Sequence, residues 1–207
     1  MNKFRLEALS DGVFAIVMTL LVIEITVPEI HHPSDTQLWL ELQQLGPLFV
    51  SYFVSFTVLA MFWISHNFFY GAFTKVVNRQ LVLLNMFYLS FVSLIPFSAH
   101  FLGSYPDSEL AVLVYGCNVF LLGAASTAVL QYAIHSEEID TSHITQRILA
   151  QARIRSYLIP AMTLIGIIAI PFSLSFALFC YAFPILFNIV PGLLNWVEQK
   201  VGLNFGD

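Results

Sequence analysis

Apolar residues gather in six long runs along the chain, and short polar segments separate most of these runs. A helix needs about 20 apolar residues to cross the hydrocarbon core of a bilayer, which matches the lengths of the runs. The fifth and sixth runs are divided only by residues 170–173, where we expect a tight turn because Pro171 cannot continue a helix. The pattern therefore predicts an all-α membrane protein with six transmembrane helices, at residues 11–27, 46–68, 80–102, 110–134, 154–170 and 172–191.

The positions of the basic residues support this count, because short cytoplasmic loops collect Lys and Arg. The connectors at 28–45, 103–109 and 170–173 contain no basic residue. All eight basic residues lie in the remaining connectors and the terminal segments: Lys3, Arg5, Lys75, Arg79, Arg147, Arg153, Arg155 and Lys200. We therefore expect a multi-pass protein of the cell membrane with both termini in the cytoplasm.

The composition excludes several classes of function. Hydrophobic residues make up 58% of the chain and charged residues 10%, whereas soluble domains carry about 25% charged residues. Six spans leave only short connectors, so we expect residues 1–207 to form a single six-helix transmembrane domain without a catalytic domain, and no enzyme. The net charge of −5 argues against nucleic acid, which requires a basic surface.

The cysteines and histidines form no pattern typical of a metal or cofactor site. Cys117 and Cys180 lie singly inside apolar runs, and the sequence has no H-E-x-x-H motif. His31 and His32 are adjacent in a connector that we expect to be solvated, at the opposite side of the membrane from His66. We therefore expect no metal and no cofactor.

Polar residues converge at the cytoplasmic ends of the first three predicted spans. Such groups are costly at membrane depth unless they pair with one another or face water. We interpret them as a structural hydrogen-bonded cluster, in which Asp11 accepts from His66 or from backbone N–H groups and Trp63 caps the cluster at the interface. A catalytic role for His66, oriented by Asp11, lacks a nucleophile. The cluster comprises Arg5, Ser10, Asp11, Trp63, His66, Asn67 and Asn85.

The beginning of the first span carries a recognisable pattern. Residues 5–16 read RLEALSDGVFAI and residues 19–25 read TLLVIEI. This segment resembles the RxxxFSD segment of bacterial members of the transmembrane protein 175 family, the endolysosomal potassium channels, with Leu9 in place of the motif's Phe. The second span's WISH at 63–66 and the third span's Asn85, Pro96 and Phe97 are also similar to that family. The resemblance covers most of the first half of the chain.

The resemblance implies a homotetramer of six-helix subunits whose first helices line a central pore. Such a pore is closed by apolar side chains and conducts potassium without a TVGYG filter, a motif that is absent here. A projection at about 100° per residue puts Gly12, Ile16, Leu20, Ile23 and Val27 on one stripe of the first helix. Ser10 and Asp11 point away from this stripe, so the helix can line a pore and keep its polar cluster inside the subunit.

These observations assign expected roles to the first helix. Ile16, Leu20 and Ile23 would form the gate, since a ring of branched apolar side chains can exclude water. Thr19 lies beside the stripe and would form a selectivity layer, and the resemblance places threonine there in some relatives. Glu24 and Glu29 would form an acidic outer vestibule, although Glu24 could equally be an interfacial carboxylate.

The sequence leaves two functions open. The first is a passive potassium channel that passes other monovalent cations more weakly. The alternative is a proton-coupled secondary transporter that uses Asp11 and His66 as a proton relay. The absence of a visible internal repeat, which many secondary transporters have, weighs against the transporter.

Overall fold

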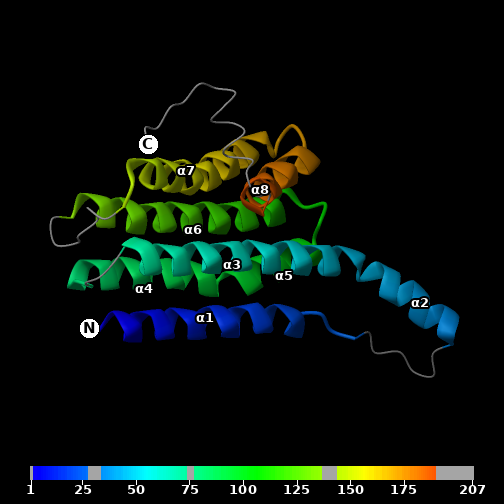
Figure 1. Cartoon of the computed structure of the whole chain (residues 1–207). Helices are drawn as coiled ribbons and strands as arrows, with labels where there is room; N and C mark the ends of the chain where they lie inside the picture. Colours follow the sequence, from blue (N-terminus) through cyan, green and yellow to red (C-terminus); the bar gives the residue numbers. More distant parts are fainter. Residues whose placement is uncertain (1, 28–33, 74–76, 137–143, 190–207) are drawn as a thin grey trace.

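The computed structural model describes residues 2–27, 34–73, 77–136 and 144–189, which are almost entirely helical (Figure 1). Side chains from the preceding connectors cap several of the helices: Asn2, Ser34, Asn78 and Ser108 each accept a hydrogen bond from a backbone N–H of the first turn. The described helices are α1 (Lys3–Ile23), α2 (Asp35–Gln44), α3 (Gly46–Phe73), α4 (Arg79–Ser93), α5 (Ile95–Ser104), α6 (Glu109–His135), α7 (Gln146–Ala169) and α8 (Leu174–Ile189).

The all-α membrane architecture predicted from the hydropathy pattern is confirmed. Five segments are long and apolar enough to cross a bilayer: Lys3–Ile23, Gly46–Gly71, Arg79–Ser104, Glu109–His135 and Gln146–Ala169. The apolar part of α8, Leu174–Ile185, is shorter, so the sixth span stays a prediction. The tight turn between α7 and α8 is confirmed, and the N–H groups of Phe172 and Ser173 both donate to the carbonyl of Ala169 there.

Four features differ from the sequence-based expectation. A polar helix, α2, lies within the expected connector 28–45, and α7 begins at Gln146 rather than at residue 154. The third span breaks into α4 and α5 at Leu94, because Pro96 cannot donate to the helical hydrogen-bond pattern. α1 ends at Ile23, so Val27 lies beyond the helix rather than on its apolar stripe. Pro28 follows Val27 and disfavours helical backbone there.

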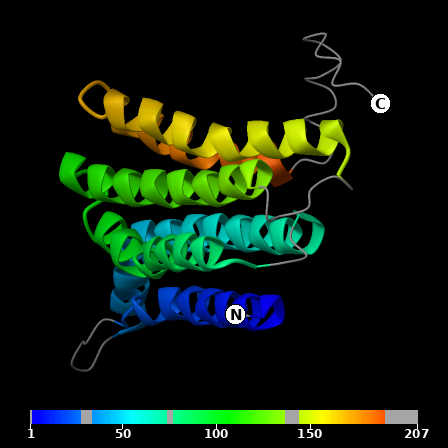
Figure 2. The same ribbon diagram turned by 90° about the vertical axis from the view of Figure 1, so that its left-hand side faces the viewer.

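The helices lie side by side in layers (Figures 1 and 2). α1 lies on one side and packs against α3, α4 and α5, while α6 packs on α4 and α5 and is covered by α7 and α8. Between α6 and α7 the ring of Tyr181 occupies space that Gly116 and Gly166 leave, since a Cβ on either glycine would overlap the ring. Small residues of this kind allow close helix packing in membranes.

Successive long helices alternate in direction, which brings the described basic residues to one end of the bundle. This end, where α1 begins, is here called the basic end; it also carries Glu7, which pairs with Lys3, and its basic residues are Lys3, Arg5, Arg79, Arg147, Arg153 and Arg155. The opposite end, here called the acidic end, carries Glu24, Asp35, Glu41, Asp107 and Glu109, with no Lys or Arg among the residues that the structure describes.

A hydrogen bond between α6 and α7 compensates for the proline inside α7. Pro160 has no N–H to donate to the carbonyl of Ser156 four residues earlier. The hydroxyl of Thr127 on α6 lies 2.8 Å from that carbonyl oxygen and 2.9 Å from the Gly123 carbonyl of its own helix, so its single proton is shared between the two acceptors. The α6–α7 contact therefore satisfies a backbone acceptor that would otherwise lack a partner inside the membrane.

We predict that Thr127→Val lowers the free energy of unfolding by about 1 to 2 kcal/mol, because it leaves the Ser156 carbonyl unsatisfied. Thermal unfolding in detergent measures the loss. Thr57→Val is the matched control, since Thr57 donates only to the Phe53 carbonyl of its own helix, and it should change little. In a Pro160→Ala background the restored N–H should reduce the cost of Thr127→Val. An unchanged cost in that background would contradict this account.

Candidate functional site

α1 has two distinct faces. Its buried face packs on the neighbouring helices and consists of Leu6, Ser10, Phe14, Val17 and Leu21. Its other face is exposed in the single chain, with Ile16 60%, Leu20 40% and Ile23 66% exposed. A Cβ added to Gly12, on the same stripe, would meet no described atom within 4 Å. An apolar stripe therefore remains uncovered along most of α1.

Thr19 lies on the exposed side of α1, and its hydroxyl bonds to its own helix. Oγ1 donates toward the carbonyls of Ala15, at 3.0 Å, and Ile16, at 2.8 Å. The proton is thus used within the helix, and the lone pairs of the oxygen remain available to accept a hydrogen bond or to bind a cation.

The polar residues expected to cluster are divided between two sets of contacts. In the first, the amide of Asn85 on α4 joins three helices: Nδ2 donates to Ser10 Oγ on α1 at 3.0 Å, and Oδ1 lies 3.0 Å from His66 Nε2 on α3. Ser10 Oγ in turn donates to the Leu6 carbonyl. Ser10, His66 and Asn85 are all buried. A buried amide with both ends bonded fixes the relative positions of the helices that it joins.

The second set is the pair of Asp11 and Trp63. Trp63 Nε1 donates to Asp11 Oδ1 at 2.9 Å, and both residues are exposed. Asp11 therefore accepts from Trp63, whereas the sequence analysis expected His66 or backbone N–H groups as its donors. Among the described residues, Arg5 and Asn67 have no side-chain hydrogen bond to this cluster.

Aromatic rings surround the His66 side chain. The ring of Tyr88 stacks on it at a centroid distance of 5.8 Å, and those of Tyr70 and Phe14 lie at 4.5 Å and 6.0 Å. These rings restrict the imidazole and hold Nε2 toward Asn85.

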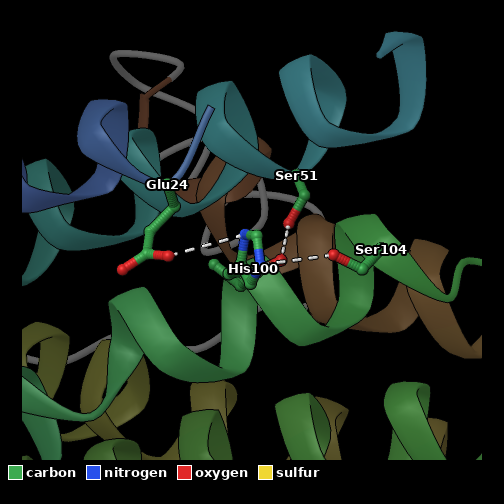
Figure 3. A network of polar contacts seen from close by, with 5 residues as sticks. Glu24, Ser51, His100 and Ser104 are labelled. Carbon is green, nitrogen blue, oxygen red and sulfur yellow. Dashed lines mark hydrogen bonds and ion pairs between the residues drawn. The ribbon is translucent and has the colours of Figure 1, made fainter. Parts of the chain in front are cut away.

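A contact that the sequence analysis did not identify joins α1 to α5 at the acidic end (Figure 3). The Glu24 carboxylate, at the end of α1, lies 3.7 Å from His100 Nδ1 and forms an ion pair when His100 is protonated. His100 Nε2 lies 3.5 Å from Ser104 Oγ. Ser51 on α3 donates to the Ala99 carbonyl beside it, so α3 and α5 are bonded at the same level. In the sequence, this contact was indicated only by the positions of Glu24 and His100 near the outer ends of the first and third spans.

Of the two residues expected to form the outer vestibule, the structure describes one. Glu24 lies at the end of α1 and is half-exposed. Glu29, the second expected vestibule residue, lies outside the described residues, as do His31 and His32.

We predict that Asn85→Ala lowers the free energy of unfolding by about 1 to 3 kcal/mol, because Ser10 and His66 each lose a buried partner. Asn67→Ala is the control, since Asn67 lies one residue from His66 without a described side-chain hydrogen bond, and it should have little effect. Thermal unfolding and size exclusion in detergent measure both. Equal destabilisation by the two variants would show that Asn85 does not join the helices.

Sequence similarity connects the chain to proteins of known type. Residues 5–96 match the family model described as endosomal/lysosomal potassium channel TMEM175. A potassium channel of Chryseobacterium sp. (strain P1-3) is 32% identical over 137 residues, which cover 66% of this chain and 68% of that protein. The zebrafish (Danio rerio) endosomal/lysosomal proton channel TMEM175 is 33% identical over 153 residues, which cover 69% of this chain and 29% of that protein.

Structural similarity extends over more of the chain. The crystal structure of a lysosomal potassium-selective channel TMEM175 homolog from Chamaesiphon minutus matches with a TM-score of 0.76 and 25% identity, covering 89% of this chain and 95% of that one. The matched segments span about two thirds of the Chryseobacterium protein and less than a third of the zebrafish protein. These relatives are named as channels and not as enzymes. The chain therefore belongs to the TMEM175 potassium channel family.

Proposed function

We propose that the chain is a potassium-permeable cation channel in which four copies surround a central pore lined by α1. The observation that carries this proposal is the similarity to potassium channels of the same family, and the exposed apolar stripe of α1 is the surface that we assign to the pore. The names of the bacterial relatives support potassium as the main ion, with other monovalent cations passing more weakly. A symmetric assembly that places this stripe at its axis would bury it against the same stripe of other copies.

In this proposal Ile16, Leu20 and Ile23 form three successive apolar rings. The helical rise separates neighbouring rings by about 4.5 to 6 Å along the pore. A narrow apolar ring expels water and so presents a barrier to a hydrated ion. The channel opens when the rings widen, and the buried face of α1 holds the helix while they do so.

Thr19 is the proposed source of the preference for potassium. An apolar ring offers no oxygen to replace water that an ion loses, whereas four Thr19 hydroxyls offer four oxygens beside the gate. Because each hydroxyl proton bonds to its own helix, the oxygens can face an ion with their lone pairs. We expect modest selectivity, since one layer of hydroxyls replaces only part of a hydration shell.

The charge separation supports an orientation for the channel. We propose six spans, with the basic end and both termini in the cytoplasm of a cell whose plasma membrane contains the channel. The acidic end then forms the outer mouth, where Glu24 and Glu29 raise the local cation concentration. Such charges act nearly equally on potassium and sodium, because both ions carry one positive charge, and salt screens the attraction within about 8 Å.

Proton-coupled transport through Asp11 and His66 is the alternative function. The zebrafish relative is named as a proton channel, which favours testing this alternative. In the described contacts, however, Asp11 bonds to Trp63 and His66 bonds to Asn85, so the proposed relay has no direct bond between its two members. Potassium flux in proteoliposomes with and without a pH gradient separates the two functions, because only a coupled transporter needs the proton gradient.

We predict that cysteine modification distinguishes the pore-facing side of α1. In a Cys117→Ala background, a charged thiol reagent should change potassium flux at least tenfold more with Ile16→Cys than with Val22→Cys. Both side chains are exposed in the single chain, but only Ile16 lies on the stripe. Liposome flux measures the effect. If modification at Val22 changed flux as much, the stripe would not be the pore wall.

We further predict that Thr19→Ala lowers the potassium-over-sodium permeability ratio, while Thr19→Ser, which keeps the hydroxyl, retains it. Glu24→Gln should lower conductance at low salt and leave the ratio unchanged. Reversal potentials under bi-ionic conditions give the ratio. An unshifted reversal potential for Thr19→Ala would place selectivity in the apolar rings instead.

A further inference from the structure

A cavity of about 300 Å³ lies between α3, α4, α6 and α7 toward the basic end. Its wall is mainly apolar and aromatic, with contributions from Phe62, Phe69, Tyr88, Leu130 and Ile159. Polar side chains line it as well, among them His66, Gln151 and Arg155. None of the residues that line the cavity belongs to α1, so the cavity is separate from the proposed pore.

The rim of the cavity, meaning the exposed residues that line it, is mainly apolar. It consists of Ile64 and Phe68 on α3 and Ile148 on α7, together with the polar Ser65 and Arg155. A cavity that opens to water normally has a polar rim, whereas exposed apolar side chains in a membrane protein face hydrocarbon. The rim therefore favours an occupant that enters from the bilayer.

Arg155 provides a positive charge at this cavity. It is exposed, and it forms no ion pair with a carboxylate among the residues that the structure describes. It begins the apolar part of α7, so it lies at the level where a transmembrane helix leaves the hydrocarbon core. A guanidinium there can bind a phosphate through two parallel hydrogen bonds.

We propose that the cavity binds an anionic phospholipid, with one acyl chain inside the cavity and the phosphate at Arg155. The volume is at the lower end of the range for ligand pockets, about 300 to 1,000 Å³, so it has room for part of one acyl chain. The second chain stays in the bilayer along the apolar rim. Basic pockets between transmembrane helices commonly bind acidic headgroups in this way.

The bound lipid would lie against a residue of the hydrogen-bonded group that joins α1 to α3 and α4. His66 lines the cavity and bonds through Nε2 to Asn85, which bonds to Ser10 on α1. An acyl chain packed against the imidazole therefore lies two hydrogen bonds from the proposed pore helix. Lipid binding itself depends only on the membrane setting, whereas an effect on conduction rests on the proposed function.

Lipid binding is measured on the full-length protein by native mass spectrometry in detergent, with phosphatidylglycerol added and phosphatidylcholine as the neutral comparison. We expect preferential binding of phosphatidylglycerol, and Arg155→Gln should weaken it about fivefold, which is the roughly 1 kcal/mol expected for one basic residue at a membrane surface. Arg153→Gln is the matched control, since Arg153 is exposed on the same helix but does not line the cavity. Equal weakening by both variants would mean nonspecific attraction and would overturn the proposal.

A cavity-filling change tests the acyl-chain part. Ala152→Leu, and separately Ser126→Leu in case the first fails to fold, should reduce phosphatidylglycerol binding in a protein whose thermal unfolding is otherwise unchanged. In a second experiment, decanoate replaces phosphatidylglycerol. If decanoate binding depends on Arg155 and phosphatidylglycerol binding does not, the occupant is a free fatty acid and the proposal is wrong. A change in oligomeric state without a change in lipid binding would identify the cavity as a contact between copies. These readouts need no ion flux, so they can fail or succeed independently of the proposed channel.

Discussion

The hydrogen bonds of the Asn85 amide determine which way α1 faces. Its donor reaches Ser10 on α1 and its acceptor lies beside His66 on α3, all at buried positions. α1 is apolar on every side, so the hydrophobic effect alone gives little preference for one rotation of the helix about its axis. The buried Asn85 amide would be costly in a membrane without a partner, and this cost favours the rotation of α1 that turns Ser10 toward it. The same rotation leaves Ile16 and Ile23 uncovered.

The sequence was sufficient for the existence of the five long apolar segments and for the common level of the polar residues Ser10, His66 and Asn85. Hydropathy reports the length of an apolar run, and the alternation of spans then brings Ser10, His66 and Asn85 to one level. The pairing within that level depended on side-chain direction, which hydropathy does not encode. Thus Asp11 bonds to Trp63, and Asn85 occupies the position between Ser10 and His66.

Helices outside the apolar runs were also missed, for a physical reason. α2 and the first two turns of α7 are too polar to register as spans, although Ser34 and Gln37 form a capping box at the start of α2. That motif is readable in a sequence, and it would have predicted a helix inside the expected connector. The Glu24–His100 contact joins residues far apart in the chain, and it depends on the rotation of both α1 and α5, which the sequence did not determine.

The break at Leu94 has a mechanical consequence for α1. α4 bonds to α1 near its beginning through Asn85, and α5 contacts it at its end through His100. The two supports of α1 thus belong to two rigid segments that meet at a joint, because Pro96 removes the hydrogen bond that would make them one rod. α1 is therefore attached to α4 at Ser10 and to α5 at Glu24, with Ile16 between the two attachments. If the angle between α4 and α5 changed, the two attachment points would move relative to each other, and α1 would have to bend or tilt between them.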